Sequence, residues 1–114
     1  MNITEVKVRR LYTEGRMRAL VSITIDGDLA IHDIKVIEGQ DRMFVAMPSR
    51  KEENGTYRDL VHPITSLARH ELERVVLDEY TKAVELRRAE EEFAARNAAE
   101  TQPQQAAQED IPLE

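Results

Sequence analysis

Apolar residues recur at alternate positions along the first sixty residues of the chain, which is typical of β-strands. The alternation occupies three segments, ITEVKVRRLY (3–12), MRALVSITI (17–25) and LAIHDIKVIEG (29–39). Two shorter runs follow, MFVAMPS (43–49) and TYRDLV (56–61). The glycines in TEGR (13–16) and DGD (26–28) predict tight turns between the first three segments. The pattern therefore predicts an antiparallel meander of about five strands.

The period changes after Pro63, because the residue before a proline is biased away from the helical conformation. Beyond it, apolar residues recur at three- and four-residue steps, and Thr65 or Ser66 is placed to cap a helix. The predicted apolar stripe is Leu67, Leu72, Val75, Val76, Tyr80, Ala83 and Leu86. A helix with this stripe would pack on the sheet, which gives an α+β fold with a C-terminal helix.

The stripe thins beyond about residue 86, where ELRRAEEEFAARNAAE (85–100) supplies strong helix formers and Glu–Arg pairs. We expect residues 83–100 to form a charged helical extension that projects into solvent. Residues 101–114, TQPQQAAQEDIPLE, contain two prolines and little apolar bulk, so we expect a disordered acidic tail. The predicted organisation is a domain over residues 1–82, the extension over 83–100 and the tail over 101–114.

The net charge of −6 is unevenly distributed along the 114 residues. Residues 1–63 carry ten basic and ten acidic side chains, whereas residues 64–114 carry six and twelve. The chain has no cysteine, which excludes disulfides and thiolate metal sites. The first twelve residues lack the apolar core of a signal peptide, and no run approaches the ~18 apolar residues of a membrane span. We therefore expect a soluble cytoplasmic protein.

Five blocks of the sequence resemble, in order and spacing, the SpoVG family (stage V sporulation protein G, putative septation protein). These blocks are TEGRMRALVSITID, IHDIKVIEG, MFVAMPSRK, YRDLVHPIT and the helix that follows. The resemblance covers residues 1 to about 82, and residues 83–114 depart from the pattern of typical short members. It implies a small antiparallel sheet with a helix, a homodimer and no cofactor. It also implies a nucleic-acid-binding regulator of cell division or developmental gene expression.

Arg50 and Lys51 are adjacent on a predicted exposed turn, and Arg58 lies across the predicted hairpin from them. Cations at such a place can neutralise phosphates and release counterions, whatever the net charge of the whole protein. The alternative is an ordinary solvated loop in which Glu52 and Glu53 neutralise the cations. We favour binding, with DNA as the ligand and RNA as a second candidate.

Two weaker groups of cations complete the candidate nucleic-acid-binding residues. Closure of the TEGR hairpin would bring together Arg9, Arg10, Arg16 and Arg18, although Glu5 and Glu14 are near enough to pair with them. Arg69 and Arg74 lie on the predicted helix, where Glu71 and Glu73 dilute their charge. Ordinary solvated, mixed-charge surfaces are the alternative for both groups.

Catalysis and metal binding have little support in the sequence. His32 and Asp33 would point to opposite faces of a regular strand, and no serine elbow or cysteine nucleophile accompanies them. We expect Asp33 and His62 to stabilise turns or satisfy backbone groups. The three histidines lack metal-binding spacing. Tyr57 is the one aromatic residue placed to touch a base or sugar.

Two functions remain for comparison with the structure. The first is a dimeric nucleic-acid-binding regulator with no enzymatic activity, no metal, no membrane association and no small-molecule substrate. The second is a dimeric protein-interaction adaptor that docks a partner through the acidic helix. The apolar segments IHDIKVI (31–37) and MFVAMP (43–48) are the expected contributors to the dimer contact.

Overall fold

The main sheet of the protein is antiparallel and its central strands follow the order of the chain. The computed structural model describes residues 1–98 and 111–112, and all structural statements refer to these residues. β1 (Ile3–Leu11), β2 (Met17–Ile25), β3 (Leu29–Glu38) and β4 (Met43–Ala46) form a meander. The predicted DGD turn is present, with positive φ at both Asp26 and Gly27.

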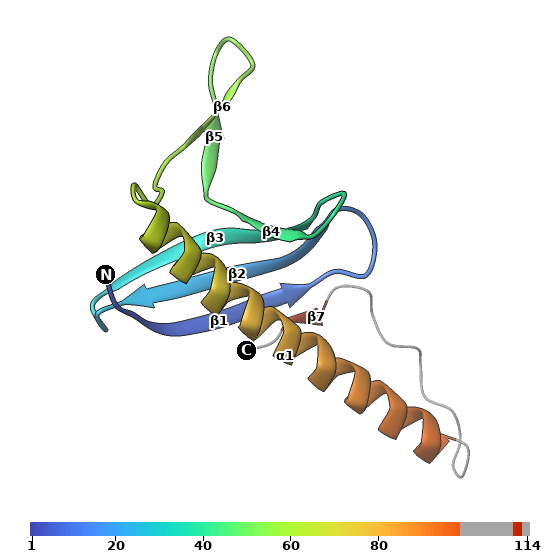
Figure 1. Cartoon of the computed structure of the whole chain (residues 1–114). Helices are drawn as coiled ribbons and strands as arrows, with labels where there is room; N and C mark the ends of the chain where they lie inside the picture. The colour runs from blue at the N-terminus through green and yellow to red at the C-terminus, as the bar shows by residue number, and fades with distance from the viewer. Residues whose placement is uncertain (99–110, 113–114) are drawn as a thin grey trace.

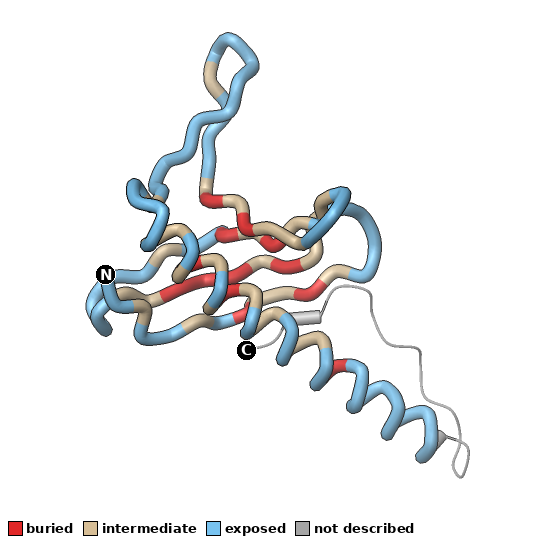
Figure 2. Tube along the Cα trace, in the orientation of Figure 1, coloured by how far each residue is buried: buried red, intermediate tan, exposed pale blue. Residues whose placement is uncertain are grey.

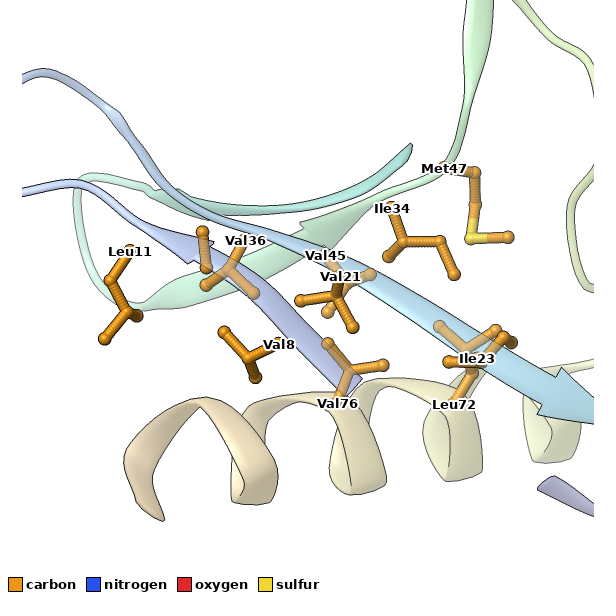
Figure 3. Packing of buried hydrophobic residues seen from close by; sticks show 11 residues of the cluster. Val8, Leu11, Val21, Ile23, Ile34, Val36, Val45, Met47, Leu72 and Val76 are labelled. Atoms are coloured by element: carbon orange, nitrogen blue, oxygen red, sulfur yellow. The ribbon is translucent and has the colours of Figure 1, made fainter. Parts of the chain in front are cut away.

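One face of this sheet carries the hydrophobic core. Val8 of β1, Val21 and Ile23 of β2 and Ile34 of β3 are at most 8% exposed. Their side chains point toward the helix, where Leu72 and Val76 complete the cluster (Figure 3). The buried positions therefore run along the middle of the sheet and the first half of the helix, with one further buried position, Arg87, in its second half (Figure 2).

The helix α1 (Ser66–Ala98) crosses this face and continues beyond it (Figure 1). Thr65 caps it, because its Oγ1 accepts a hydrogen bond from the Ala68 amide at 3.1 Å. The predicted projection into solvent is confirmed for residues 88–97, which are all exposed, whereas Ala83 and Val84 still pack against the core. Among the described residues no helix is sufficiently apolar over sufficient length to cross a bilayer.

The predicted apolar stripe is wrong at its two ends, where Leu67 is 78% and Leu86 61% exposed. At 3.6 residues per turn, Leu67 lies about 180° around the helix from Val76, and Leu86 about 80°. Arg87 lies only about 20° from Val76 and is 9% exposed. The aliphatic stem of an arginine therefore continues the buried face where the sequence suggested a leucine.

The segment after β4 leaves the main sheet as a separate two-stranded ribbon. β5 (Ser49–Lys51) pairs antiparallel with β6 (Tyr57–Asp59), and the ribbon projects from the body of the protein (Figure 1). The sequence suggested that TYRDLV returns along MFVAMPS within one sheet. The strands instead divide into a meander and a ribbon, because β6 pairs with the residues that follow Pro48.

The predicted disordered tail lies outside the described residues except at Ile111 and Pro112. These two residues form β7 (Ile111–Pro112), which pairs antiparallel with Leu11 and Arg10 at the free edge of β1. The expectation of disorder did not include this pairing. The predicted helical extension of residues 83–100 is described as far as residue 98.

Candidate nucleic-acid interface

The β5–β6 ribbon is held at its base and ordered at its tip. At the base, Met47 is 6% exposed in the core and the Leu60 amide donates to the Pro48 carbonyl at 2.8 Å. At the tip, the Asn54 side-chain oxygen accepts from the Thr56 amide at 3.1 Å and from the Thr56 hydroxyl at 2.7 Å. Gly55 takes φ +89°, which suits glycine. The ribbon therefore presents its side chains from a defined backbone.

The strand register separates the cations of the ribbon onto its two faces. Arg50 pairs directly with Arg58, whereas Lys51 pairs with Tyr57. Directly opposed residues share a face, and successive residues alternate between faces. One face therefore carries two guanidinium groups, and the other carries an ammonium group beside a tyrosine that is 71% exposed.

The acidic neighbours neutralise this ribbon only in part. Glu52 approaches Arg58 at 3.5 Å, but the Arg58 side chain is 80% exposed, so the ion pair is weak. Within the described residues, Arg50 and Lys51 have neither a hydrogen bond nor an ion pair from their side chains. The ribbon lines an open depression of about 660 Å³ formed by Arg50, Lys51, Glu52, Glu53, Asn54, Thr56, Tyr57 and Arg58.

The four arginines predicted to cluster at the first hairpin divide into two pairs. Arg16 Nε donates to the Glu38 carbonyl at 3.3 Å, and Arg18 pairs with the Glu38 carboxylate. Arg9 lies on β1, where its Nε donates to Ser22 Oγ at 3.3 Å, and Arg10 is its neighbour. Arg16 and Arg18 therefore fasten the hairpin to β3, while Arg9 and Arg10 belong to the sheet.

Tyr80 on α1 lies near the Arg18 and Glu38 pair. Burial raises the pKa of its phenol, and the positive charge of Arg18 opposes that shift while the negative charge of Glu38 adds to it. The phenol therefore stays protonated further into the alkaline range than a free tyrosine. This corner of the molecule joins the helix to the first hairpin.

Within the described part of the chain, no hydrogen bond or ion pair joins the side chains of the two helix cations, Arg69 and Arg74, to the β5–β6 ribbon. Arg74 is exposed and lies 3.8 Å from Asp78 one turn later. Arg69 is half-buried near the start of α1. Arg74 therefore belongs to a mixed-charge helix surface, whereas the Arg69 side chain forms no ion pair with another described residue.

His62 contacts a backbone group, as the sequence analysis expected, because its Nδ1 lies 3.1 Å from the Pro63 carbonyl oxygen. Asp33 instead lies within β3, where it has φ +64°. His32 Nδ1 lies 2.7 Å from Ser22 Oγ, a contact across two strands that sequence reasoning missed. Among the described residues, no three His, Cys, Asp or Glu side chains gather closely enough to hold a metal ion.

Sequence reasoning also missed Lys7 and Lys35 as candidate cations. Both lie on strands of the main sheet, and Lys35 pairs with Leu20 on one side and Ala46 on the other. Strict alternation along β3 would place Lys35 on the same face as Ile31, which packs against the core, and so away from any ligand on the other face. The strands contain β-bulges that change the alternation, and one-dimensional periodicity does not reveal them.

Comparison with known proteins places these features in a family context. The SpoVG family model matches residues 1–82. A protein of Lachnospira eligens named "Putative septation protein SpoVG" is 57% identical over 83 residues, which cover 73% of this chain and 94% of the relative. Proteins of the same name from Caldanaerobacter subterraneus and a Thermoanaerobacter species are 54% and 51% identical. The former match covers 75% of this chain and 93% of the relative, and the latter 81% and 100%.

Proposed function

This chain belongs to the SpoVG family, and from that premise we propose that it is a dimeric nucleic-acid-binding regulator linked to septation or development. DNA is the proposed ligand, with RNA as the second candidate. The β5–β6 ribbon is the proposed contact surface. The role involves no catalytic step and no cofactor. The relatives' name supplies the link to septation, and the ribbon supplies the chemistry.

The observation that carries the proposal is the direct cross-strand pairing of Arg50 with Arg58. Like charges opposite each other destabilise a two-stranded pairing. A phosphate group between the two guanidinium groups would turn this repulsion into attraction, and arginine suits phosphate because its donors form a planar fork. In the free protein, Glu52 reduces the repulsion between the two arginines through its ion pair with Arg58.

The shape of the ribbon supports the same ligand. The major groove of B-DNA is about 12 Å wide and admits a two-stranded β-ribbon. In such a position both faces of the ribbon meet the ligand, so Arg50 and Arg58 would contact one side while Lys51 and Tyr57 contact the other. In the groove, the cations on both faces of the ribbon would contribute to binding. If the ribbon only rested on the outside of the duplex, the cations of a single face would contact it.

The acidic C-terminal part of the protein is set away from the ribbon. The exposed residues 88–97 lie at the far end of a helix that rises ~1.5 Å per residue, whereas the ribbon precedes its first turn. At physiological salt the Debye length is about 8 Å, so charges several turns along the helix are screened from the ribbon. The net negative charge therefore does not oppose local binding of a polyanion.

Exposed apolar side chains support the proposed homodimer. Leu60 and Ile64 lie in the segment that joins the ribbon to α1, and Leu67 lies in the first turn of α1; they are 65%, 88% and 78% exposed, respectively. Exposed apolar patches of this kind mark protein interfaces. A second copy on this segment, together with the apolar positions of β3 and β4, would bury them and place two ribbons in one assembly. Sedimentation that shows only monomer at micromolar concentration would reject the dimer.

The test of the proposal is the double variant Arg50→Ala/Lys51→Ala, assayed by electrophoretic shift against pooled genomic DNA and total RNA. We expect weaker binding to all sequences and a fall in the slope of log K against log salt of about 2 units for each ribbon that contacts the nucleic acid, hence about 4 units if both ribbons of the dimer do so. Arg58→Ala should add to the defect. The matched control is Arg88→Ala/Arg96→Ala, which removes the same charge from the exposed half of α1.

Two outcomes would overturn the proposal. An unchanged affinity and salt slope in the folded, dimeric double variant would remove the ribbon from the interface. Absence of any nucleic-acid retention by the wild-type protein, even at low salt, would instead favour the adaptor function through the acidic helix.

A further inference from the structure

The face of the main sheet that α1 leaves uncovered has its own pattern of side chains. On the opposite face, which packs against α1, the strand register aligns a buried row formed by Leu11, Ala19, Val36 and Val45. The adjacent row is formed by Arg10, Leu20, Lys35 and Ala46. Because successive side chains point to opposite faces, this second row faces away from the helix. It crosses all four strands of the meander.

A β-bulge in β3 brings His32 onto the same face. Ile31 pairs with Ile23 and Ile34 pairs with Val21, so His32 and Asp33 together oppose Ser22. The positive φ of Asp33, +64°, accommodates the extra residue. Ile31 and Ile34 therefore both pack toward the core, and His32 lies over Ser22 on the uncovered face.

Ser22 connects two longer side chains across this face. It is only 7% exposed, and its Oγ lies 2.7 Å from His32 Nδ1 and 3.3 Å from Arg9 Nε. An arginine N–H can only donate, so the serine oxygen accepts from Arg9, while the same hydroxyl contacts the His32 ring. A buried hydroxyl thus orients a guanidinium from β1 and an imidazole from β3.

Cations flank this centre on both sides. β1 contributes Lys7, which pairs with Ser22, together with Arg9 and Arg10, and β3 contributes Lys35 beside His32. Neighbouring strands lie about 4.8 Å apart, so these two groups are roughly 10 Å from each other across β2. Two carboxylates belong to the same face, Glu5 opposite Thr24 at one end and the exposed Asp33, which opposes Ser22 together with His32.

We propose that the open sheet face, defined as Lys7, Arg9, Arg10, His32 and Lys35, is a second phosphate-contacting surface for the nucleic acid bound by the ribbon. The inference rests on the proposed function. Lys35 pairs with Ala46, which lies three residues before β5, so the cations continue from β1 across β3 toward the ribbon. Such an extended series matches the repeated charges of a nucleic-acid backbone, whereas a mononucleotide would need them gathered in one place.

Ser22 is a positioning residue in this proposal. The Arg9 guanidinium and the His32 ring both contact Ser22 Oγ, so the ligand would meet two side chains that are already oriented. Preorganisation of this kind reduces the ordering cost of binding. Ser22 itself need not touch the ligand, because it acts through His32 and Arg9.

The decisive variant is Arg10→Ala/Lys35→Ala, which removes both cations from one cross-strand row. We expect weaker binding and a fall in the salt slope for duplex DNA of about 2 units for each protomer whose open sheet face contacts the ligand. The control Arg88→Ala/Arg96→Ala changes the net charge equally and should behave like the wild type. Ser22→Ala should weaken binding several-fold at unchanged salt slope, because no charge is lost, and Ser22→Thr should restore affinity. Circular dichroism and thermal melting establish that each variant is folded.

The outcomes separate this inference from the function on which it rests. If Arg10→Ala/Lys35→Ala matches the control while Arg50→Ala/Lys51→Ala loses affinity, the ribbon is the interface and the open sheet face is not. If Ser22→Ala leaves affinity unchanged, Ser22 has no positioning role. If the wild-type protein binds neither DNA nor RNA, the proposed function fails and this inference fails with it.

Discussion

Two leucines on α1 provide a matched test of how the helix lies on the sheet. Leu72 is 3% exposed in the core, whereas Leu67 is 78% exposed near the start of the same helix. Leu72→Ala removes buried carbons and leaves a cavity, which costs about 3 kcal/mol in comparable cores. Leu67→Ala should change the free energy of unfolding by less than about 0.5 kcal/mol. Since small domains are stable by only about 5–15 kcal/mol, the first change is large.

Urea unfolding and thermal melting measure this difference directly. For a domain of this size, a loss of about 3 kcal/mol lowers Tm by roughly 12–24 °C. Equal losses in Leu67→Ala and Leu72→Ala would refute the helix orientation on which the core assignment depends. A loss in Leu67→Ala that grows as the protein is diluted would instead assign Leu67 to the contact between two copies, because only association depends on concentration.

Three further predictions concern the helix and the C-terminus. Because the pKa of Tyr80 is raised in the folded protein, its contribution to stability is complete below pH 10 and is lost as pH rises through the folded-state pKa. The Tyr80→Phe variant should therefore lose less stability than the wild type in urea titrations at pH 9 to 11. Thr65→Ala removes the cap of α1 and should cost about 1 kcal/mol, while Thr65→Ser should retain most of it; equal effects would argue against capping. Truncation after Glu100 should leave the melting temperature nearly unchanged, because β7 contributes only two paired residues, and a fall of many degrees would contradict this.

The elements of the fold could be predicted because their signals are local. Alternation identifies the strands of the meander, and the DGD turn requires residues that tolerate positive φ. The cap at Thr65 is likewise local. The faces of these elements were harder to predict, because each bulge shifts the alternation by one residue. Arg87 shows a second reason, since its long side chain can occupy a buried position that hydropathy assigns to Leu86.

The candidate site was predictable in composition and less so in arrangement. Arg50, Lys51 and Arg58 are on an exposed hairpin, as the sequence indicated. Their division between two faces required the register of β5 and β6, which depends on where the turn begins. The contact between Ser22 and His32 could not be predicted from spacing, because the two residues lie on different strands and meet only through the bulge.

The bulge at Asp33 has a consequence for how β3 can vary among related chains. It makes β3 two half-strands in opposite phase, with Ile31 in one half and Ile34 in the other. Many substitutions within either half would preserve the inward and outward sets. Deletion of one residue between Ile31 and Ile34 would preserve them as well, because it would remove the bulge and leave a regular strand in which both isoleucines face the core. Deletion at a regular position of β3 would instead rotate one half by 180° and exchange its core side chains with its surface side chains. The bulge is therefore a point at which β3 can lose one residue and still present the same side chains to the core.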